Sequence, residues 1–306
     1  MSSGTDGGTM PATSTPGPSR ELRPVSLTRY SAAVVITVFV IVSQYFVPQT
    51  VPATRILYGN LPGDLFLVYG IPVIAFAFLV GAGPLRNWRA NMGVAGWEGL
   101  RWYGMLSALA LVIVIMLAIL YELIDPSALA LLNRPNPALT QAKGNPWFFV
   151  GFSFVVGAFE ETIFRGWIFG YWRSRPGSWV VPATWTSVVF AGVHLYYGTT
   201  YGPAYPLIFP SLFFVGFALA ATYRFSGGNL VAPALLHGAN DASAYLTLVS
   251  AEIGAAVHYL IILVGLVIAL VHYSWGSQKP RALAVPPAWP EGSAVTAPVI
   301  PPIGAT

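Results

Sequence analysis

Three charged residues, Glu160, Glu161 and Arg165, lie inside one of the most apolar stretches of the chain, the run from Trp147 to Trp172. If this run crosses a bilayer, each charge near its centre costs about 2.5–3.5 kcal/mol. Charges that are kept inside a membrane usually mark a transport pathway or a reactive site. The cluster is therefore the first candidate for the chemistry of this protein.

The spacing of these three residues divides them into a pair and a single carboxylate. Glu161 and Arg165 are four residues apart, so on a helix they face each other and are expected to form an ion pair. Glu160 is rotated by one residue from that pair, which leaves its carboxylate free to point into a polar site and to take a proton from water. The alternative is that all three form one charge cluster that locks helices together.

Two later apolar runs carry residues that could complete a site. His194 closes the segment Phe190-Ala-Gly-Val-His194, near the outer half of its run. His237 and Asp241 are four residues apart, so both side chains can point at one metal ion, water molecule or oxyanion. A lone His on an apolar face is more often a packing residue. Together, however, these histidines and carboxylates supply a metal-ligand or general-base set.

The composition indicates that helices in a membrane position these residues. Hydrophobic residues make up 55% of the 306 residues and charged residues only 8%, whereas soluble domains carry roughly 25% charged residues. We predict an all-α integral membrane protein with about eight transmembrane helices and an active site in the core formed by helices four to seven. The eight apolar runs are Tyr30–Val47, Leu61–Val80, Trp102–Leu123, Trp147–Trp172, Trp179–Tyr197, Pro206–Tyr223, Leu230–Leu248 and Ile253–Trp275.

The basic residues predict how the chain is oriented. With eight spans and an inside N-terminus, only Arg55, Arg134 and Lys143 of the 15 Lys and Arg residues fall in outside loops, and Arg165 lies within a span. The other 11 fall on the inside, which predicts a multi-pass protein of the cell membrane with cytoplasmic N- and C-termini. The basic residues are spread singly, so no nucleic-acid partner is expected. The absence of Cys excludes disulfide and thiol chemistry.

Three ordered motifs carry a resemblance to a known family. The segments Glu160-Glu161-Thr-Ile-Phe-Arg165, Phe190-Ala-Gly-Val-His194 and His237-Gly-Ala-Asn-Asp241 resemble the three motifs of the CPBP family of intramembrane proteases, which includes CAAX prenyl endopeptidases and bacteriocin-processing enzymes. The match spans about Phe152–Tyr245. The resemblance implies a helical membrane enzyme that hydrolyses peptide bonds.

The resemblance also implies roles for single residues. Glu160 and His194 would activate water, with Glu161 in the same catalytic set. His237 and Asp241 would complete the site, either as metal ligands or as a polar group that stabilises the oxyanion. The candidate ligands for a divalent metal such as Zn are Glu160, His194, His237 and Asp241, and no other cofactor is expected. The residues expected to support the site are Arg165, Phe190 and Asn240.

Composition and motifs together predict five segments along the chain. We expect a disordered N-terminal tail at 1–28, three transmembrane helices at 29–145, CPBP-like catalytic helices at 146–250, a last transmembrane helix at 251–276 and a disordered Pro-rich tail at 277–306.

The functional hypothesis is an intramembrane endopeptidase that cleaves membrane-associated or lipid-proximal substrates, with CAAX-type substrates as one branch. Its expected partners are membrane lipid and a membrane-associated peptide or protein. The chain has no His-Glu-x-x-His, Gly-x-Gly-Asp or Gly-x-Ser-Gly motif, and neither Ser187 nor Ser243 lies in an activating turn. His258 and His272 are expected near opposite ends of the last span.

Two alternatives stay open. The first is a proteolytically idle immunity or scaffold protein of the same family. The second is a proton-coupled transporter, against which the lack of a visible internal repeat argues.

Overall fold

The computed structural model describes residues 25–51, 63, 65–85, 97–127, 139, 142–173, 178–226 and 228–274. Within these residues the chain is helical and contains no strand, which confirms the predicted all-α fold. Ser26 caps the first helix by accepting a hydrogen bond from the backbone of Arg29, so the helix begins at Leu27, inside the tail predicted for 1–28. The rest of that tail and the tail predicted for 277–306 lie outside the described residues.

Each predicted apolar run corresponds to one helical segment among the described residues. Two of these segments contain a π-helical stretch, η2 and η4, and a short helix α12 (Tyr196–Tyr201) and a 3-10 turn η5 (Gly202–Ala204) precede the sixth. The eight segments are α1 (Leu27–Thr50), η2 (Leu65–Gly70) with α4 (Ile71–Leu79), α6 (Trp97–Ile124), α9 (Pro146–Glu161) with η4 (Thr162–Phe169) and α10 (Gly170–Arg173), α11 (Val180–Val193), α13 (Tyr205–Phe225), α14 (Val231–Leu246) and α15 (Ala251–Ser274).

Five of the described stretches are long and apolar enough to cross a membrane. These are Leu27–Gln44, Leu100–Ile124, Pro146–Trp172, Gly202–Phe225 and Ala251–Leu270. The stretches Leu65–Leu79 and Val180–Val193 are apolar but shorter. Helix α14 belongs to neither group, since polar residues of the candidate site interrupt it. The described residues thus contain a helical segment for each of the eight predicted runs, and five of these segments meet the length and composition of a membrane span.

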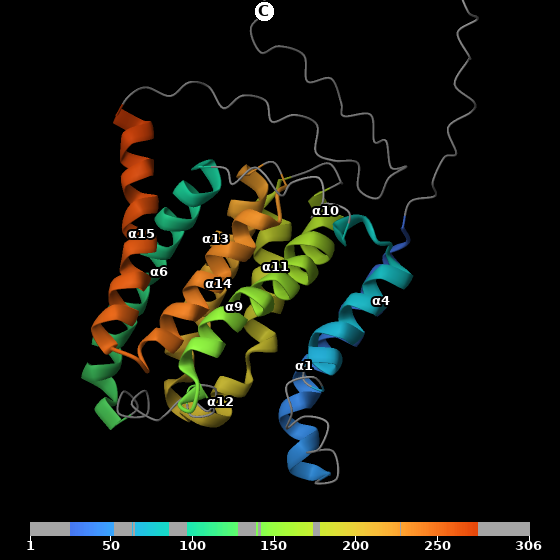
Figure 1. Ribbon diagram of the computed structural model, residues 1–306, viewed down its shortest axis with the longest axis horizontal. Coiled ribbons are helices and arrows are strands. Elements are labelled where there is room, and N and C mark those ends of the chain that lie inside the picture. Colours follow the sequence, from blue (N-terminus) through green and yellow to red (C-terminus); the bar gives the residue numbers. More distant parts are fainter. Residues whose placement is uncertain are drawn as a thin grey trace, which may run out of the picture.

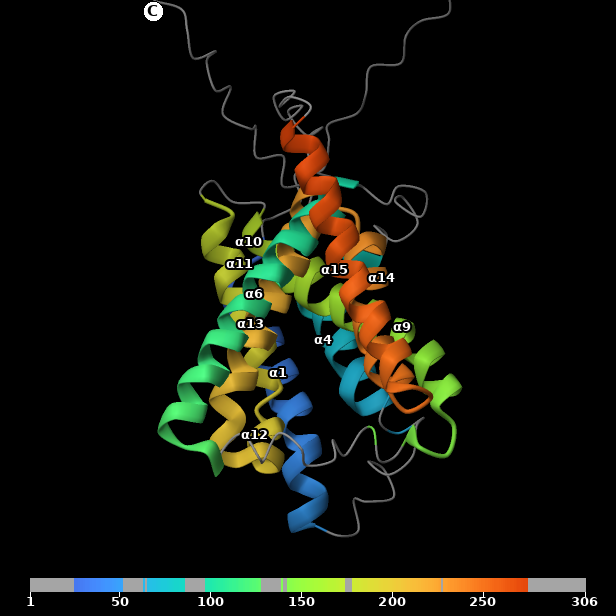
Figure 2. The same cartoon turned by 90° about the vertical axis from the view of Figure 1, so that its left-hand side faces the viewer.

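Six of the long segments make a closed circuit of contacts, and two others pack outside it. Helix α9 packs on α14, α14 on α15, α15 on α6, α6 on α13, α13 on α11, and α11 on η4, which continues α9 (Figures 1 and 2). Helices α1 and α4 pair with each other and contact α11 and η4 from the outside. The candidate motifs lie on α9, η4, α11 and α14, so their residues share the interior of this circuit.

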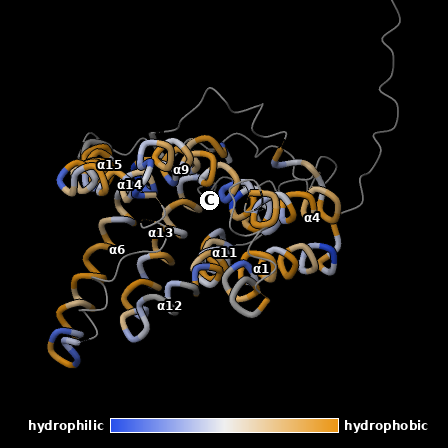
Figure 3. The backbone as a smooth tube through the Cα atoms, turned by 60° about the horizontal axis from the view of Figure 1, so that its bottom comes forward, coloured by the Kyte–Doolittle hydropathy of each residue, from blue (hydrophilic) through white to orange (hydrophobic). Residues whose placement is uncertain are grey.

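The outer helices carry the hydrophobic surface expected next to lipid. Helix α6 exposes large apolar side chains such as Met116 and Leu123, which are 65% and 79% exposed, and α15 exposes Leu270. Figure 3 shows hydrophobic residues along most of α6 and α1. A soluble protein rarely exposes such a continuous apolar area. This surface agrees with the predicted integral membrane protein.

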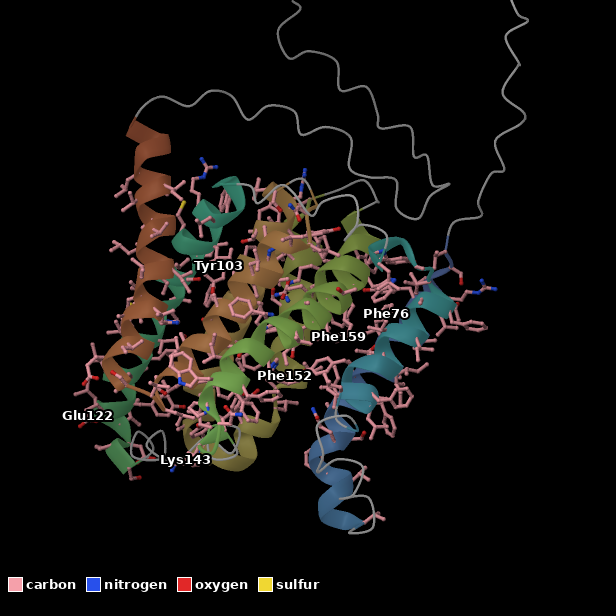
Figure 4. The ribbon with its side chains drawn as sticks, in the orientation of Figure 1. Phe76, Tyr103, Glu122, Lys143, Phe152 and Phe159 are labelled. Atoms are coloured by element: carbon pink, nitrogen blue, oxygen red, sulfur yellow. The ribbon has the colours of Figure 1, made fainter. Side chains whose placement is uncertain are left out.

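An aromatic cluster holds the outer α1 and α4 pair against η4. The rings of Phe76 on α4 and Trp167 on η4 stack with centroids 5.4 Å apart, and Tyr30 stacks on Tyr171 at 3.9 Å. The indole nitrogen of Trp167 donates to the carbonyl of Gly81 at 2.7 Å. Figure 4 labels Phe76 on the α4 side of this contact. The cluster fixes the position of the N-terminal helices relative to the charged helix.

Two helix pairs approach each other through glycines. On the α9 and α14 pair, a Cβ atom added to Gly157 would lie 2.9 Å from the carbonyl oxygen of Ala234, and one added to Gly238 would lie 2.7 Å from the Cα atom of Phe154. On the α6 and α15 pair, a Cβ atom added to Gly104 would lie 2.5 Å from the Cα atom of Gly265. Small residues at such crossings let membrane helices pack backbone to backbone.

Candidate active site

The predicted ion pair between Glu161 and Arg165 is present at the junction of α9 and η4. Nη1 of Arg165 donates to Oε1 of Glu161 at 2.7 Å, and both side chains are completely buried. Nη2 of Arg165 donates to the backbone carbonyl of Gly216 on α13 at 2.7 Å. The guanidinium also lies 4.8 Å from the centroid of the Phe190 ring. The buried charge is thus compensated from three helices.

The backbone changes from α to π geometry directly after these carboxylates. Helix α9 ends at Glu161, and η4 continues it with hydrogen bonds such as that from the backbone nitrogen of Gly170 to the carbonyl of Arg165, five residues earlier. Short π-helical segments inside α-helices are rare and occur frequently at functional sites. The switch therefore marks the same place in the chain as the charged cluster does.

Glu161 also connects the ion pair to the second predicted histidine. Its Oε1 atom lies 2.8 Å from Nδ1 of His237 on α14. An ionised carboxylate can only accept, so Nδ1 of His237 is the donor in this hydrogen bond. Arg165, Glu161 and His237 therefore form one continuous chain of polar contacts from η4 to α14. The side chain of Glu161 holds the orientation of the imidazole ring.

The other nitrogen of His237 faces two carboxylates. Its Nε2 atom lies 3.7 Å from Oε2 of Glu160 and 3.5 Å from Oδ2 of Asp241. These distances exceed those of a direct hydrogen bond, and a single small molecule or substrate atom can lie within reach of all three groups. The side chains are 4% exposed for His237, 12% for Glu160 and 32% for Asp241. The structure thus brings together three of the predicted site residues, with Asp241 nearest to the solvent or lipid.

Tyr69 of η2 contributes a contact to this group that the sequence analysis did not predict. Its hydroxyl donates to Oε1 of Glu160 at 3.2 Å. Its ring stacks on Phe159 of α9, with centroids 5.6 Å apart. Figure 4 shows Phe159 on α9. The only signal in the sequence was a hydroxyl-bearing aromatic residue inside the weakly apolar second run, which does not by itself indicate a site.

His194 lies at the end of α11 instead of inside a longer helix. The predicted run continued to Tyr197, whereas α11 ends at Val193 and His194 is its C-cap. Nδ1 of His194 contacts the carbonyl of Phe190 at 2.7 Å, and because a carbonyl only accepts, this nitrogen is the donor. His194 is also close enough to interact electrostatically with Asp241.

Phe190 is the aromatic residue that links the two predicted histidines. Its ring centroid lies 4.8 Å from that of His194 and 5.6 Å from that of His237. The same ring is the one that the guanidinium of Arg165 approaches. Asn240 has a smaller contact, since its Nδ2 atom donates to Oδ1 of Asp241 at 3.4 Å. Phe190 and Asn240, like Arg165, therefore touch members of the predicted site.

The side chains of Ser187, Ser243 and His258 make their contacts outside this group. Oγ of Ser187 donates to the carbonyl of Ala183 at 2.7 Å, and Oγ of Ser243 donates to that of Asn240 at 2.5 Å, so both hydroxyls bond to their own helices. His258 lies on α15 with its ring beside Tyr259. The side chain of His272 lies outside the described residues.

The hydrogen bonds of the two histidines leave Nε2 of each ring as the nitrogen that would face a metal ion. Nδ1 of His194 donates to the carbonyl of Phe190 and Nδ1 of His237 donates to Glu161, and a histidine that binds a metal through Nε2 commonly makes such a bond. Within the residues that the structure describes, no group of three or more His, Asp or Glu side chains is arranged to hold a metal ion. The predicted ligand set of Glu160, His194, His237 and Asp241 remains a prediction.

The family comparison covers the part of the chain that carries this geometry. Residues 142–243 match the family described as type II CAAX prenyl endopeptidase, Rce1-like. These residues form an Rce1-like domain. The match confirms the resemblance that the three motifs carried, and all three lie within it. No curated protein and no solved structure matches the chain. Tyr69 lies outside the Rce1-like domain, although its hydroxyl contacts a carboxylate inside it.

Tyr103 of α6 is a second residue outside the Rce1-like domain that lies near the site. It is 2% exposed and packs against Ala218 and Leu219 of α13, toward which its ring points in Figure 4. It is close enough to interact electrostatically with Asp241 and Glu161. Helix α6 therefore closes the circuit of helices on the side opposite to α4 (Figure 1).

Proposed function

We propose that the protein is an intramembrane endopeptidase that hydrolyses peptide bonds of membrane-associated or lipid-proximal substrates, with prenylated CAAX-type C-termini as the substrate class to test first. One observation carries the proposal. Oε2 of Glu160 and Nε2 of His237 face each other at 3.7 Å in a buried polar group inside an Rce1-like domain. A carboxylate and an imidazole at this spacing are suited to general acid and base chemistry on a substrate between them.

In the proposed reaction Glu160 is the general base. A water molecule beside Oε2 attacks the carbonyl carbon of the scissile bond, and its proton passes to Oε2 while the new carbon–oxygen bond forms. The carbon–nitrogen bond then breaks, and the proton moves from Oε2 to the leaving nitrogen. No atom of the enzyme becomes part of the product. The surrounding apolar helices keep other water away from the carboxylate, which strengthens its interactions.

The two histidines serve the same reaction in different ways. With Nδ1 hydrogen-bonded to the carbonyl of Phe190, a neutral His194 ring presents Nε2 as an acceptor that can orient the attacking water. His237, held through Nδ1 by Glu161, can present a protonated Nε2 to the oxyanion that develops on the substrate. Arg165 acts through Glu161 and fixes the position of that carboxylate.

The experiment uses the full-length protein in lipid nanodiscs and a quenched fluorescent peptide with a farnesylated CAAX C-terminus. The unprenylated peptide serves as a second substrate. We expect cleavage by the wild type, and a loss of at least about 100-fold in kcat for Glu160→Gln with the fold retained. The matched control is Glu252→Gln, since Glu252 is exposed at the start of α15.

Three outcomes would contradict the proposal. Full activity of Glu160→Gln would exclude Glu160 as the base. No cleavage of either peptide, together with full complementation of a cellular phenotype by Glu160→Gln, would instead favour a proteolytically idle scaffold. Solute-dependent proton flux in proteoliposomes that Asp241→Asn abolishes would favour a transporter.

A further inference from the structure

We propose that Tyr69 is a positioning residue of the site, which fixes the carboxylate of Glu160 with one oxygen anchored and the other presented to the reacting groups. This inference rests on the proposed endopeptidase function and assigns a role to a residue outside the Rce1-like domain. It follows from how the two oxygens of one carboxylate are used.

The two oxygens of Glu160 have different surroundings. Oε1 accepts the hydrogen bond from the hydroxyl of Tyr69 at 3.2 Å. Oε2 is buried, has no hydrogen-bond partner among the described residues and faces Nε2 of His237 at 3.7 Å. A buried carboxylate oxygen without a hydrogen bond is costly, and a catalytic role is one explanation for it. Oε2 is thus the oxygen left for water or substrate.

A single anchored oxygen is sufficient to set the direction of the other. The terminal torsion of a Glu side chain has a broad and nearly two-fold energy profile, so an unanchored carboxylate rotates readily. The hydrogen bond from Tyr69 restricts this rotation and directs Oε2 toward His237. Without the hydroxyl the carboxylate would still be present, but it would spend less time in the productive orientation.

The ring of Tyr69 is itself held in place from two sides. It stacks on Phe159, the residue that directly precedes Glu160, and it packs against the aromatic and aliphatic cluster that joins α1, α4 and η4. The residue lies in the π-helical stretch η2, directly before α4. Both π-helical stretches of the described chain therefore carry a residue of the site, Tyr69 in η2 and Arg165 in η4.

The outer helix pair thereby gains a role in the chemistry. Helices α1 and α4 lie outside the circuit of the other helices, and they contact it through η4 and α11 (Figures 1 and 2). The hydrogen bond from the hydroxyl of Tyr69, in the η2 stretch directly before α4, connects this pair to the carboxylate of Glu160. A displacement of α4 away from α9 would remove the anchor and leave the rest of the site intact.

Kinetics of Tyr69→Phe on the farnesylated peptide test this role. The substitution removes the hydroxyl and keeps the ring that stacks on Phe159. We expect kcat to fall about tenfold, the size of one hydrogen bond to a charged group, with KM within about twofold of the wild type. The matched control is Tyr259→Phe on α15, whose ring is 53% exposed, and it should behave as the wild type.

A thermal double-mutant cycle tests the contact without any substrate. Tyr69→Phe should lower the unfolding midpoint in the wild type and should lower it by less than half as much in Glu160→Ala, because the acceptor is already gone. Equal shifts in both backgrounds would overturn the contact. A normal kcat for Tyr69→Phe, alongside an inactive Glu160→Gln, would overturn the role. Failure of the proposed function is distinct, since the wild type would then cleave neither peptide.

Discussion

Two helix pairs of this protein pack through close glycine contacts, and they differ in the side chains next to the crossing. Helices α9 and α14 cross at Gly157 and Gly238, and helices α6 and α15 cross at Gly104 and Gly265. In the first pair the residue before Gly238 is His237, and the two carboxylates follow Gly157 by one helical turn.

The second pair carries no carboxylate or imidazole within a turn of Gly104 or Gly265; the side chains of Arg101, Tyr103 and Ser107 are buried there, and its outward surface is apolar. The α6 and α15 pair exposes residues such as Leu260 and Leu263 to the surroundings. Close backbone approach through glycine is a general means of packing membrane helices. What makes the first crossing a candidate site is the placement of the two carboxylates Glu160 and Glu161 and the imidazole of His237 within a turn of it. The comparison predicts that equal disturbances of the two crossings have unequal effects on activity.

The largest effect is expected where charge compensation is removed from the first pair. Arg165→Met leaves Glu161 buried beside His237 without its cation and should destabilise the fold by about 3–5 kcal/mol. Activity on the farnesylated peptide should be lost. Thermal unfolding in detergent and peptide cleavage measure the two effects. The control Arg29→Met changes an exposed residue and should shift stability by less than about 0.5 kcal/mol. A stable and active Arg165→Met protein would show that the ion pair is dispensable.

The direct comparison of the two crossings uses one substitution in each. Gly238→Ala introduces a Cβ atom 2.6 Å from Cδ1 of Phe154, and Gly265→Ala introduces one 2.6 Å from Cα of Gly104. Each should destabilise by about 1–3 kcal/mol because a helix has to move. Only Gly238→Ala should also lower kcat per folded molecule, by about 10- to 100-fold, since displacement of His237 by about 1 Å changes the reacting geometry.

Folded fraction and initial rates measured on the same samples separate the two effects. Equal loss of specific activity in both variants would break the comparison, because it would mean that the crossing of α6 and α15 also sets the geometry of the site. Unchanged specific activity in both would mean that α14 adapts to the added atom without moving His237.

The smallest effect is expected for Asn240, at the edge of the cluster formed by Glu160, His237 and Asp241. Asn240→Ala removes the 3.4 Å hydrogen bond to Asp241, a long contact on a partly exposed carboxylate. We expect a change in kcat of about two- to fivefold and a change in stability below about 1 kcal/mol. His258→Gln on α15 is the control outside the site. A loss as large as that of Gly238→Ala would show that Asn240 contacts the substrate.

The contacts within single helices were predictable from the sequence. The ion pair of Glu161 with Arg165, and the shared face of His237 and Asp241, follow from a spacing of four residues. The eight helical segments follow from apolar runs. The family resemblance follows from the order of three short motifs, each of which is weak alone.

The contacts between helices were not predictable from these patterns. The hydrogen bond from His237 to Glu161 and that from Tyr69 to Glu160 join residues 76 and 91 positions apart. Helical periodicity says which residues share a face, but it does not say which face meets which. The π-helical stretches and the end of α11 at Val193 were missed for a related reason. The π-helical stretches and the end of α11 depend on how the neighbouring helices pack. The hydrophobicity of the side chains does not predict this packing.

The buried guanidinium of Arg165 also affects how the protein is synthesised and inserted into the membrane. Its carbonyl partner on α13 lies 51 residues further along the chain, and the imidazole that binds the shared carboxylate lies 76 residues beyond that carboxylate. At a synthesis rate of about 5–20 residues per second, the charged helix exists for roughly 4–15 s before its last partner leaves the ribosome. During this interval the nascent segment has to be sheltered by the insertion machinery. The position of a helix with buried charges in the sequence is therefore constrained in two ways. It must suit the finished packing, and it must limit the time before the partner residues are synthesised.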